Sequence, residues 1–80
     1  MRLNRAVVLA EAGQVGRALA ELEALEGMDD YQPFHAARAF VLGMAGRRDD
    51  ALAAYDRAIA MAPTPADAAL LRRRRRDAAH

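Results

Sequence analysis

The segment Arg5-Ala6-Val7-Val8-Leu9-Ala10-Glu11-Ala12-Gly13 decides the fold of this chain, because it recurs thirty-three positions later as Arg38-Ala39-Phe40-Val41-Leu42-Gly43-Met44-Ala45-Gly46. The match continues through Ala18-Leu19-Ala20, which falls on Ala51-Leu52-Ala53. Ala pairs arise by chance in an Ala-rich chain, so the matching Arg, Val, Leu and Gly residues carry the argument. Self-similarity at such a period is typical of stacked helical repeats, which bury their apolar faces against neighbouring units. We therefore predict tandem helical units that bind rather than catalyse.

Composition limits the remaining choices. The 80 residues are enough for one small domain, and the absence of Cys excludes disulfides and thiolate-bound metals. All twelve basic residues are Arg, and the formal net charge of +1 gives no overall attraction to nucleic acid or membrane. No apolar stretch is long enough to cross a bilayer, and no basic-then-apolar leader is present. We expect a cytoplasmic protein without a membrane partner.

Apolar periodicity predicts two helices in the first half of the chain. The first runs from Leu3 to Ala12, and Gly13 and Gly16 bracket a tight turn after it. The second runs from about Arg17 to Glu26 and stops at Gly27.

The second half repeats this plan and adds a closing helix. A third helix is expected from Pro33 to Ala45, followed by a fourth with Asp49 or Asp50 capping its amino end. Thr64 is expected to cap a fifth helix in which Pro65 is the first residue and Asp67 completes a capping-box variant.

These elements predict an all-α fold, with residues 1–80 as a single domain. Repeat 1 covers about residues 2–27, repeat 2 covers about residues 32–63, and a C-terminal capping helix covers about residues 65–78.

The second unit resembles a tetratricopeptide repeat, whose pattern of small, apolar and aromatic positions it matches at Ala39, Leu42, Gly46, Ala51, Tyr55, Ala58 and Pro63. Small residues suit positions where two helices cross closely, and the aromatic fills the gap between units. The first unit matches less fully, because Leu22 and Leu25 stand where the aromatic and the last Ala would be. The resemblance implies two helix-turn-helix repeats and a capping helix in an α-α superhelix.

Three segments, at residues 3–11, 31–39 and 46–59, also resemble in wording and order the C-terminal extension of bacterial extracytoplasmic-function sigma factors. The resemblance covers Arg2 to about Arg74, with departures at Phe34, Gly43 and Arg75. Because that family tends to place Leu at the position of Arg75, we expect weaker packing at the end of the fifth helix. The resemblance implies a regulatory role in transcription initiation, with RNA polymerase or the rest of a sigma factor as protein partner. The chain contains no promoter-melting region or helix-turn-helix of its own, so we expect no independent promoter recognition.

The tetratricopeptide resemblance also implies a partner-binding face, because the first helix of each pair lines the concave side of such arrays. The residues expected there are Asn4, Val7, Glu11, Ala36, Phe40 and Met44. Phe40 and Met44 lie four residues apart and would floor a pocket for an extended or helical peptide. The alternative that these residues pack against the next helix stays open.

Catalysis is not expected. The chain has no Ser, Cys or Lys, one Thr better used as a cap, and two His, so no nucleophile with its base can be assembled. His35 is expected to be a packed or surface residue rather than a metal ligand, because no second ligand lies four residues away. The acids Glu21, Glu23, Asp29 and Asp30 are expected to be solvated. We expect no enzyme activity, cofactor, metal or small-molecule substrate.

The basic run Arg72, Arg73, Arg74, Arg75 and Arg76 allows three interpretations. Five consecutive helical residues point all around the axis, and Arg at a helix C-terminus opposes the dipole, which favours a structural role. Phosphate contacts would instead indicate a nucleic-acid-associated protein, although no aromatic side chains are interleaved to stack on bases. Contacts to an acidic protein surface are the third interpretation. A stand-alone peptide-binding adaptor also remains open as an alternative to the sigma-factor role.

Overall fold

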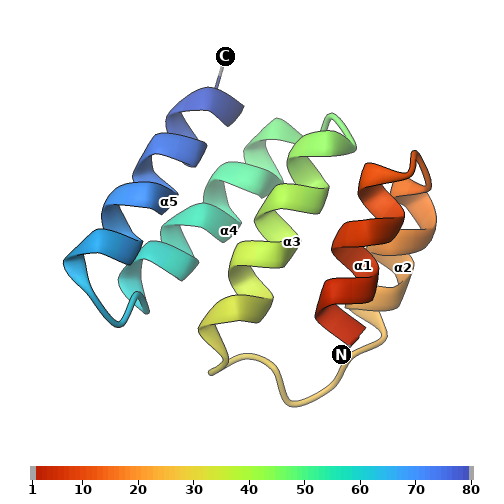
Figure 1. The fold of residues 1–80 in the computed structure, drawn as a ribbon, viewed down its shortest axis with the longest axis horizontal. Helices are drawn as coiled ribbons and strands as arrows, with labels where there is room; N and C mark the ends of the chain where they lie inside the picture. The colour runs from red at the N-terminus through yellow and green to blue at the C-terminus, as the bar shows by residue number, and fades with distance from the viewer. Residues whose placement is uncertain (1, 80) are drawn as a thin grey trace.

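The computed structural model describes residues 2–79, and within that range the chain is helical without a strand (Figure 1). The elements are α1 (Arg2–Glu11), α2 (Val15–Glu23), α3 (Gln32–Met44), α4 (Arg48–Ala60) and α5 (Pro65–Ala78). The prediction of an all-α fold is confirmed, and the observed α5 has the bounds expected for the closing helix. No helix in residues 2–79 combines the length and the apolar character needed to span a bilayer.

The helices are arranged as two hairpins followed by a single helix. Connections of three residues join α1 to α2 and α3 to α4, so each pair packs as an antiparallel hairpin. The α1–α2 hairpin lies at one end of the molecule, the α3–α4 hairpin lies in the middle, and α5 packs on α4 at the opposite end (Figure 1). Helix α3 contacts both α1 and α2, which gives a slab of 31 × 30 × 18 Å.

Two apolar clusters hold this arrangement together. One joins the first hairpin to α3 through Leu3, Ala6, Ala10, Ala18, Leu22, Phe34 and Val41. The other joins α3, α4 and α5 through Ala39, Leu42, Ala51, Ala54, Tyr55, Ala58 and Leu71. Alanine supplies seven of these fourteen side chains, which lets the helix axes approach closely. The second hairpin therefore belongs to both clusters, and its buried side chains link the two ends of the molecule.

The turns within the two hairpins have the same hydrogen bonds. The Gln14 amide donates to the Leu9 carbonyl at 2.9 Å, and the Arg47 amide donates to the Leu42 carbonyl at 3.0 Å, thirty-three positions later. The preceding glycine of each turn has a positive φ, +90° at Gly13 and +77° at Gly46. A glycine with positive φ, followed by a residue whose amide donates to the carbonyl five positions earlier, is a Schellman motif. This motif satisfies carbonyls that would otherwise be unpaired at a helix C-terminus. The repeated sequence thus gives a repeated turn.

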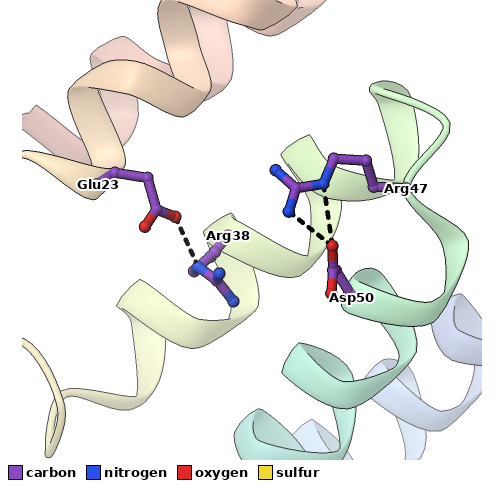
Figure 2. Close-up of polar contacts among 4 residues, drawn as sticks. All are labelled: Glu23, Arg38, Arg47 and Asp50. Carbon is purple, nitrogen blue, oxygen red and sulfur yellow. Dashed lines mark hydrogen bonds and ion pairs between the residues drawn. The ribbon is translucent and has the colours of Figure 1, made fainter.

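The helix starts test two capping predictions. Thr64 caps α5 as expected, since its hydroxyl oxygen accepts from the Asp67 amide at 3.1 Å and donates to the Asp67 carboxylate at 2.8 Å. The prediction that Asp49 or Asp50 caps α4 is wrong. Arg47 occupies the cap position without a side-chain cap, and its guanidinium binds the Asp50 carboxylate at 2.7 Å (Figure 2). The two acids still lie in the first turn, where they oppose the positive end of the helix dipole.

Helix α2 differs most from the sequence-based prediction. It spans residues 15–23 rather than 17–26, and residues 24–31 form the connection to α3. Gly27 has a φ of +72° in this connection, so it shapes the loop rather than ending the helix. The His35 ring Nε2 lies 2.7 Å from the Asp29 carbonyl oxygen, which also accepts from the Arg57 guanidinium at 3.1 Å. These bonds to the second hairpin favour an extended connection over another turn of α2.

Candidate functional site

Helices α1, α3, α4 and α5 line two adjoining hollows, which together we name the α1–α3–α5 groove. One hollow of about 380 Å³ is lined by Phe40, Gly43, Met44, Tyr55, Arg74, Asp77 and Ala78. The other, of about 300 Å³, is lined by Val7, Glu11, Ala36, Ala37, Phe40 and Arg74. Phe40 and Arg74 line both hollows, so they lie at the centre of the groove.

The groove gathers most of the residues that the sequence placed on a partner-binding face. Val7, Glu11 and Ala36 line one hollow, Met44 lines the other, and Phe40 lines both. Asn4 is exposed on α1 but is not among the residues that line either hollow. Phe40 also packs partly against the apolar cluster of the first hairpin, so it has a structural role in addition to its place in the groove.

The polar groups of the groove have a defined arrangement around its apolar floor. Arg74 contributes a cation that lines both hollows, while Glu11 lines one hollow and Asp77 lines the other. Burial raises the pKa of the Tyr55 phenol, Arg74 lowers it to a lesser degree, and Asp77 raises it slightly. The Tyr55 side chain, which lines one of the hollows, is therefore uncharged at neutral pH. An apolar floor with a single flanked cation suits a peptide segment that presents an apolar side chain near a carboxylate.

The five consecutive arginines of α5 do not form one patch. Arg75 turns toward α4, where its Nε binds the Asp56 carboxylate at 2.7 Å and its Nη2 binds the other oxygen at 3.3 Å. Arg74 is exposed but lines the groove, and Arg72, Arg73 and Arg76 are exposed as well. The predicted distribution around the helix is confirmed. The weak packing expected at Arg75 is not found, because this ion pair fastens α5 to α4 and the helix continues to Ala78.

Ion pairs also involve two of the acids that were expected to be solvated. Glu23 accepts from Arg38 at 2.8 Å and thereby joins α2 to α3 (Figure 2). Glu21 accepts from Arg5 at 2.9 Å and joins α2 to α1. Both side chains remain partly exposed to solvent, as expected, and each also pairs with an arginine of a neighbouring helix.

His35, which was expected to be either a packed or a surface residue, is a partly buried residue with packing contacts. Its ring contacts the Phe34 ring edge-to-face at 5.3 Å, in addition to its bond to the interhelical connection. Within residues 2–79, no group of three or more His, Asp or Glu side chains is placed to hold a metal ion.

Sequence reasoning missed five residues that line the groove: Ala37, Gly43, Tyr55, Asp77 and Ala78. It also treated Arg74 as one member of a collar rather than as a groove residue. Helical spacing from the buried Leu71 gives a signal for this face of α5, because Arg74 and Ala78 follow it three and seven residues later. Tyr55 was assigned to the gap between units, and it does belong to the cluster that joins α3, α4 and α5.

Comparisons with known proteins gave a similar sequence in one protein but no matching family model or solved structure. An uncharacterized protein of Rhizobium meliloti (strain 1021) is 39% identical over 71 residues, which cover 88% of this chain. The matched segment is 17% of the length of that relative, so the chain corresponds to a small part of it.

Proposed function

We propose that this chain is a protein-interaction module that binds a segment of a partner protein in the α1–α3–α5 groove, without a catalytic role. The observation that carries the proposal is the continuity of the two hollows through Phe40 and Arg74. Together they offer a concave surface that is lined largely by apolar side chains and has an arginine common to both hollows, which suits a peptide segment.

We propose further that the hairpins form a tetratricopeptide-type superhelix with α5 as the capping helix. The repeated Schellman turns support this assignment, because equivalent glycines and amide bonds lie thirty-three positions apart. The complete burial of Ala39, Ala51 and Ala58 is a second support, since these are the small positions of the resembled pattern. In such a superhelix the first helices of successive pairs line one side, and α1 and α3 both contribute to the groove.

The regulatory extension of an extracytoplasmic-function sigma factor is the role that we propose for this module. The resemblance from Arg2 to about Arg74 supports it, and the much greater length of the Rhizobium meliloti relative agrees with a segment that works as part of a larger protein. The proposed partner is RNA polymerase or the remainder of the sigma factor, and the corresponding location is the bacterial cytoplasm.

Binding to purified bacterial RNA polymerase core, and separately to sigma-factor core-binding and promoter-binding regions, tests the proposal. We expect Phe40→Ala and Arg74→Gln each to weaken binding about tenfold, because both lie centrally in the groove. Leu70→Ala and Arg76→Gln are matched controls on exposed positions of α5 and should leave the affinity nearly unchanged. Equal effects of groove and control variants, or no binding to any of these proteins, would contradict the proposal.

The nucleic-acid alternative is distinguished in the same experiment. If the chain instead bound DNA with an affinity that fell steeply with salt, and replacement of Arg72–Arg76 by Gln abolished this binding, the arginine run would be the functional surface. The structure argues against this outcome, because Arg75 is already paired with Asp56 and Arg74 lines the groove, so the five arginines do not form one continuous surface.

A further inference from the structure

The internal repeat gives each position of the first hairpin a counterpart in the second, and burial differs sharply at one such pair. Val41 on α3 is completely buried because α3 packs against the first hairpin. Its counterpart Val8 on α1 is 64% exposed. The same type of side chain at the same place in the repeat is therefore covered on one hairpin and open on the other.

The polar contacts around Val41 show what covers such a position. Arg38, one turn before Val41, binds Glu23 near the C-terminus of the preceding α2 (Figure 2). Arg57 on α4 binds the Asp29 carbonyl in the connection that follows α2. A preceding hairpin therefore covers the next unit with three things: apolar side chains, a carboxylate for the arginine, and its outgoing connection.

The equivalent place on the first hairpin is hollow. Arg5, the counterpart of Arg38, lines a hollow of about 400 Å³ together with Glu21, Ala24 and Leu25. Ala24 and Leu25 are the counterparts of Arg57 and Ala58, which in the second hairpin lie against the incoming chain. Leu25 remains half-buried, whereas Ala58 is fully buried and its carbonyl accepts from Gln32.

A polar atom at this hollow also has no hydrogen-bond partner. The Oε2 atom of Glu21 is shielded from solvent and accepts no hydrogen bond within residues 2–79. The Arg17 Nε lies 3.9 Å away, too far for a hydrogen bond, while Arg5 binds the other oxygen of Glu21. This oxygen is therefore free to accept a hydrogen bond from a donor that is brought to the hollow.

We propose that this outer face, formed by Arg5, Val8, Glu21, Ala24 and Leu25, is a stacking surface for a further helical hairpin. The second helix of that hairpin would place small apolar side chains over Val8 and a carboxylate against Arg5, as α2 does with Val41 and Arg38. Its outgoing connection would enter the hollow and supply a donor to Glu21. This surface is separate from the α1–α3–α5 groove, so the inference stands independently of the proposed function.

Charge argues against a second copy of this chain as the occupant. The surface that a copy would bring from its open end is α5, which carries five arginines and exposes Leu70. The five arginines outnumber the two aspartates of α5, Asp67 and Asp77, so the helix has a net positive charge, and like charges across an interface are unfavourable. A hairpin that offers a carboxylate fits the outer face better than α5 does.

The test extends the full chain with a stand-in hairpin. A second copy of residues 1–33 is fused ahead of Met1, which keeps the thirty-three-residue period and brings the Glu23 of the added copy to the Arg5 of the original. Because the chain has no Cys, Val8→Cys introduces a single thiol whose reaction rate with Ellman's reagent reports exposure. We expect the thiol in the original copy to react at least about tenfold more slowly than the same substitution in the added copy, because stacking protects it from attack outside local opening.

Two further measurements complete the test. The fusion should melt at least about 5 °C above the 80-residue chain, and Val8→Asp in the original copy, but not in the added copy, should abolish that rise. Equal thiol rates in the two copies, including the case in which the added hairpin stays unfolded, would overturn the proposal. Protection of the Val8→Cys thiol in the 80-residue chain that grows with concentration, together with dimers in sedimentation, would also overturn it by identifying a second copy as the occupant.

Discussion

The two hairpins contain the same turn but have different surroundings. Their Schellman endings match bond for bond, yet the second hairpin is enclosed by the first on one side and by α5 on the other. The first hairpin has a described neighbour on one side, so Val8 is exposed where Val41 is buried. The repeated sequence therefore determines the local conformation, while the number of neighbours determines how much each repeated residue contributes to stability.

The largest expected difference between the hairpins is at this valine pair. Val41→Asp should reduce the free energy of unfolding by about 3 kcal/mol or more, because it places a charge in a fully buried site without a partner. Val8→Asp should change it by less than about 0.5 kcal/mol, because the site is open to water. Urea denaturation followed by circular dichroism measures both.

A milder pair of variants covers the case in which Val41→Asp does not fold. Val41→Ala should cost about 2 kcal/mol through lost apolar burial and a residual cavity, and Val8→Ala should cost much less. Similar losses in the free energy of unfolding for Val41→Ala and Val8→Ala would contradict the difference in burial between these two side chains.

The next effect concerns the turns, where the hairpins should behave alike. Gly13→Ala and Gly46→Ala should each cost about 1 kcal/mol, because a side chain is strained at positive φ even where no neighbouring atom is within contact distance. Gly43→Ala is the matched control, since this residue lies within α3 and has open space around it. It should stabilise the protein by up to about 0.5 kcal/mol through reduced flexibility of the unfolded chain. Thermal denaturation of the three variants compares them, and a loss at Gly43 equal to that at Gly46 would contradict the assigned turn geometry.

These pairs show why much of the fold was predictable. Short-range signals determine the turns at Gly13 and Gly46 and the Thr64 cap, because the residues that form each feature lie within a few positions of one another. The tetratricopeptide resemblance also gave five of the groove residues, because it assigned the face of the first helix in each pair to a partner, and residues spaced by three or four positions share such a face.

The features that sequence did not predict depend on contacts between distant residues. The early end of α2 accompanies bonds from His35 and Arg57 to the Asp29 carbonyl, six and twenty-eight positions away. Arg74 enters the groove because α5 packs on α4 in one particular rotation. Composition and periodicity contain no information on that rotation, so the arginine run could be described from sequence only as a collar.

A smaller effect is expected from the ion pairs that connect successive units. Glu23 and Asp56 are counterparts in the repeat, and each meets an arginine of the next helix, Arg38 in α3 and Arg75 in α5. Double-mutant cycles with Glu23→Gln and Arg38→Met, and with Asp56→Asn and Arg75→Met, should each give a coupling of about 0.5 kcal/mol. The value is small because the side chains remain partly exposed, and it should decrease with added salt.

The pair Arg47–Asp50 is the control for these cycles, because it lies within one turn of α4 and connects no two helices. Its removal should lower the stability of α4 slightly without changing the protection of α3 or α5 in hydrogen exchange. Loss of the Arg38–Glu23 pair should increase exchange at the junction of α2 and α3. Identical exchange patterns for the two losses would argue against a joining role for Arg38.

The smallest expected effect on the free energy of unfolding concerns the counterparts Leu22 and Tyr55. It arises only at alkaline pH. The first hairpin buries an aliphatic side chain at this position, whereas the second buries a phenol whose pKa is raised above its ordinary value of 10.0, chiefly by burial. The folded protein therefore holds the phenol proton more tightly than the unfolded chain, so stability is retained below pH 10 and decreases as the pH rises above it. Tyr55→Phe should make the alkaline decrease in the free energy of unfolding shallower, as measured by urea denaturation from pH 8 to 11.

Tyr31→Phe, at an exposed position in the connection before α3, should leave the decrease close to that of the unaltered protein. The same slope in both variants would mean that the second hairpin does not bury its aromatic residue in the way that distinguishes it from the first.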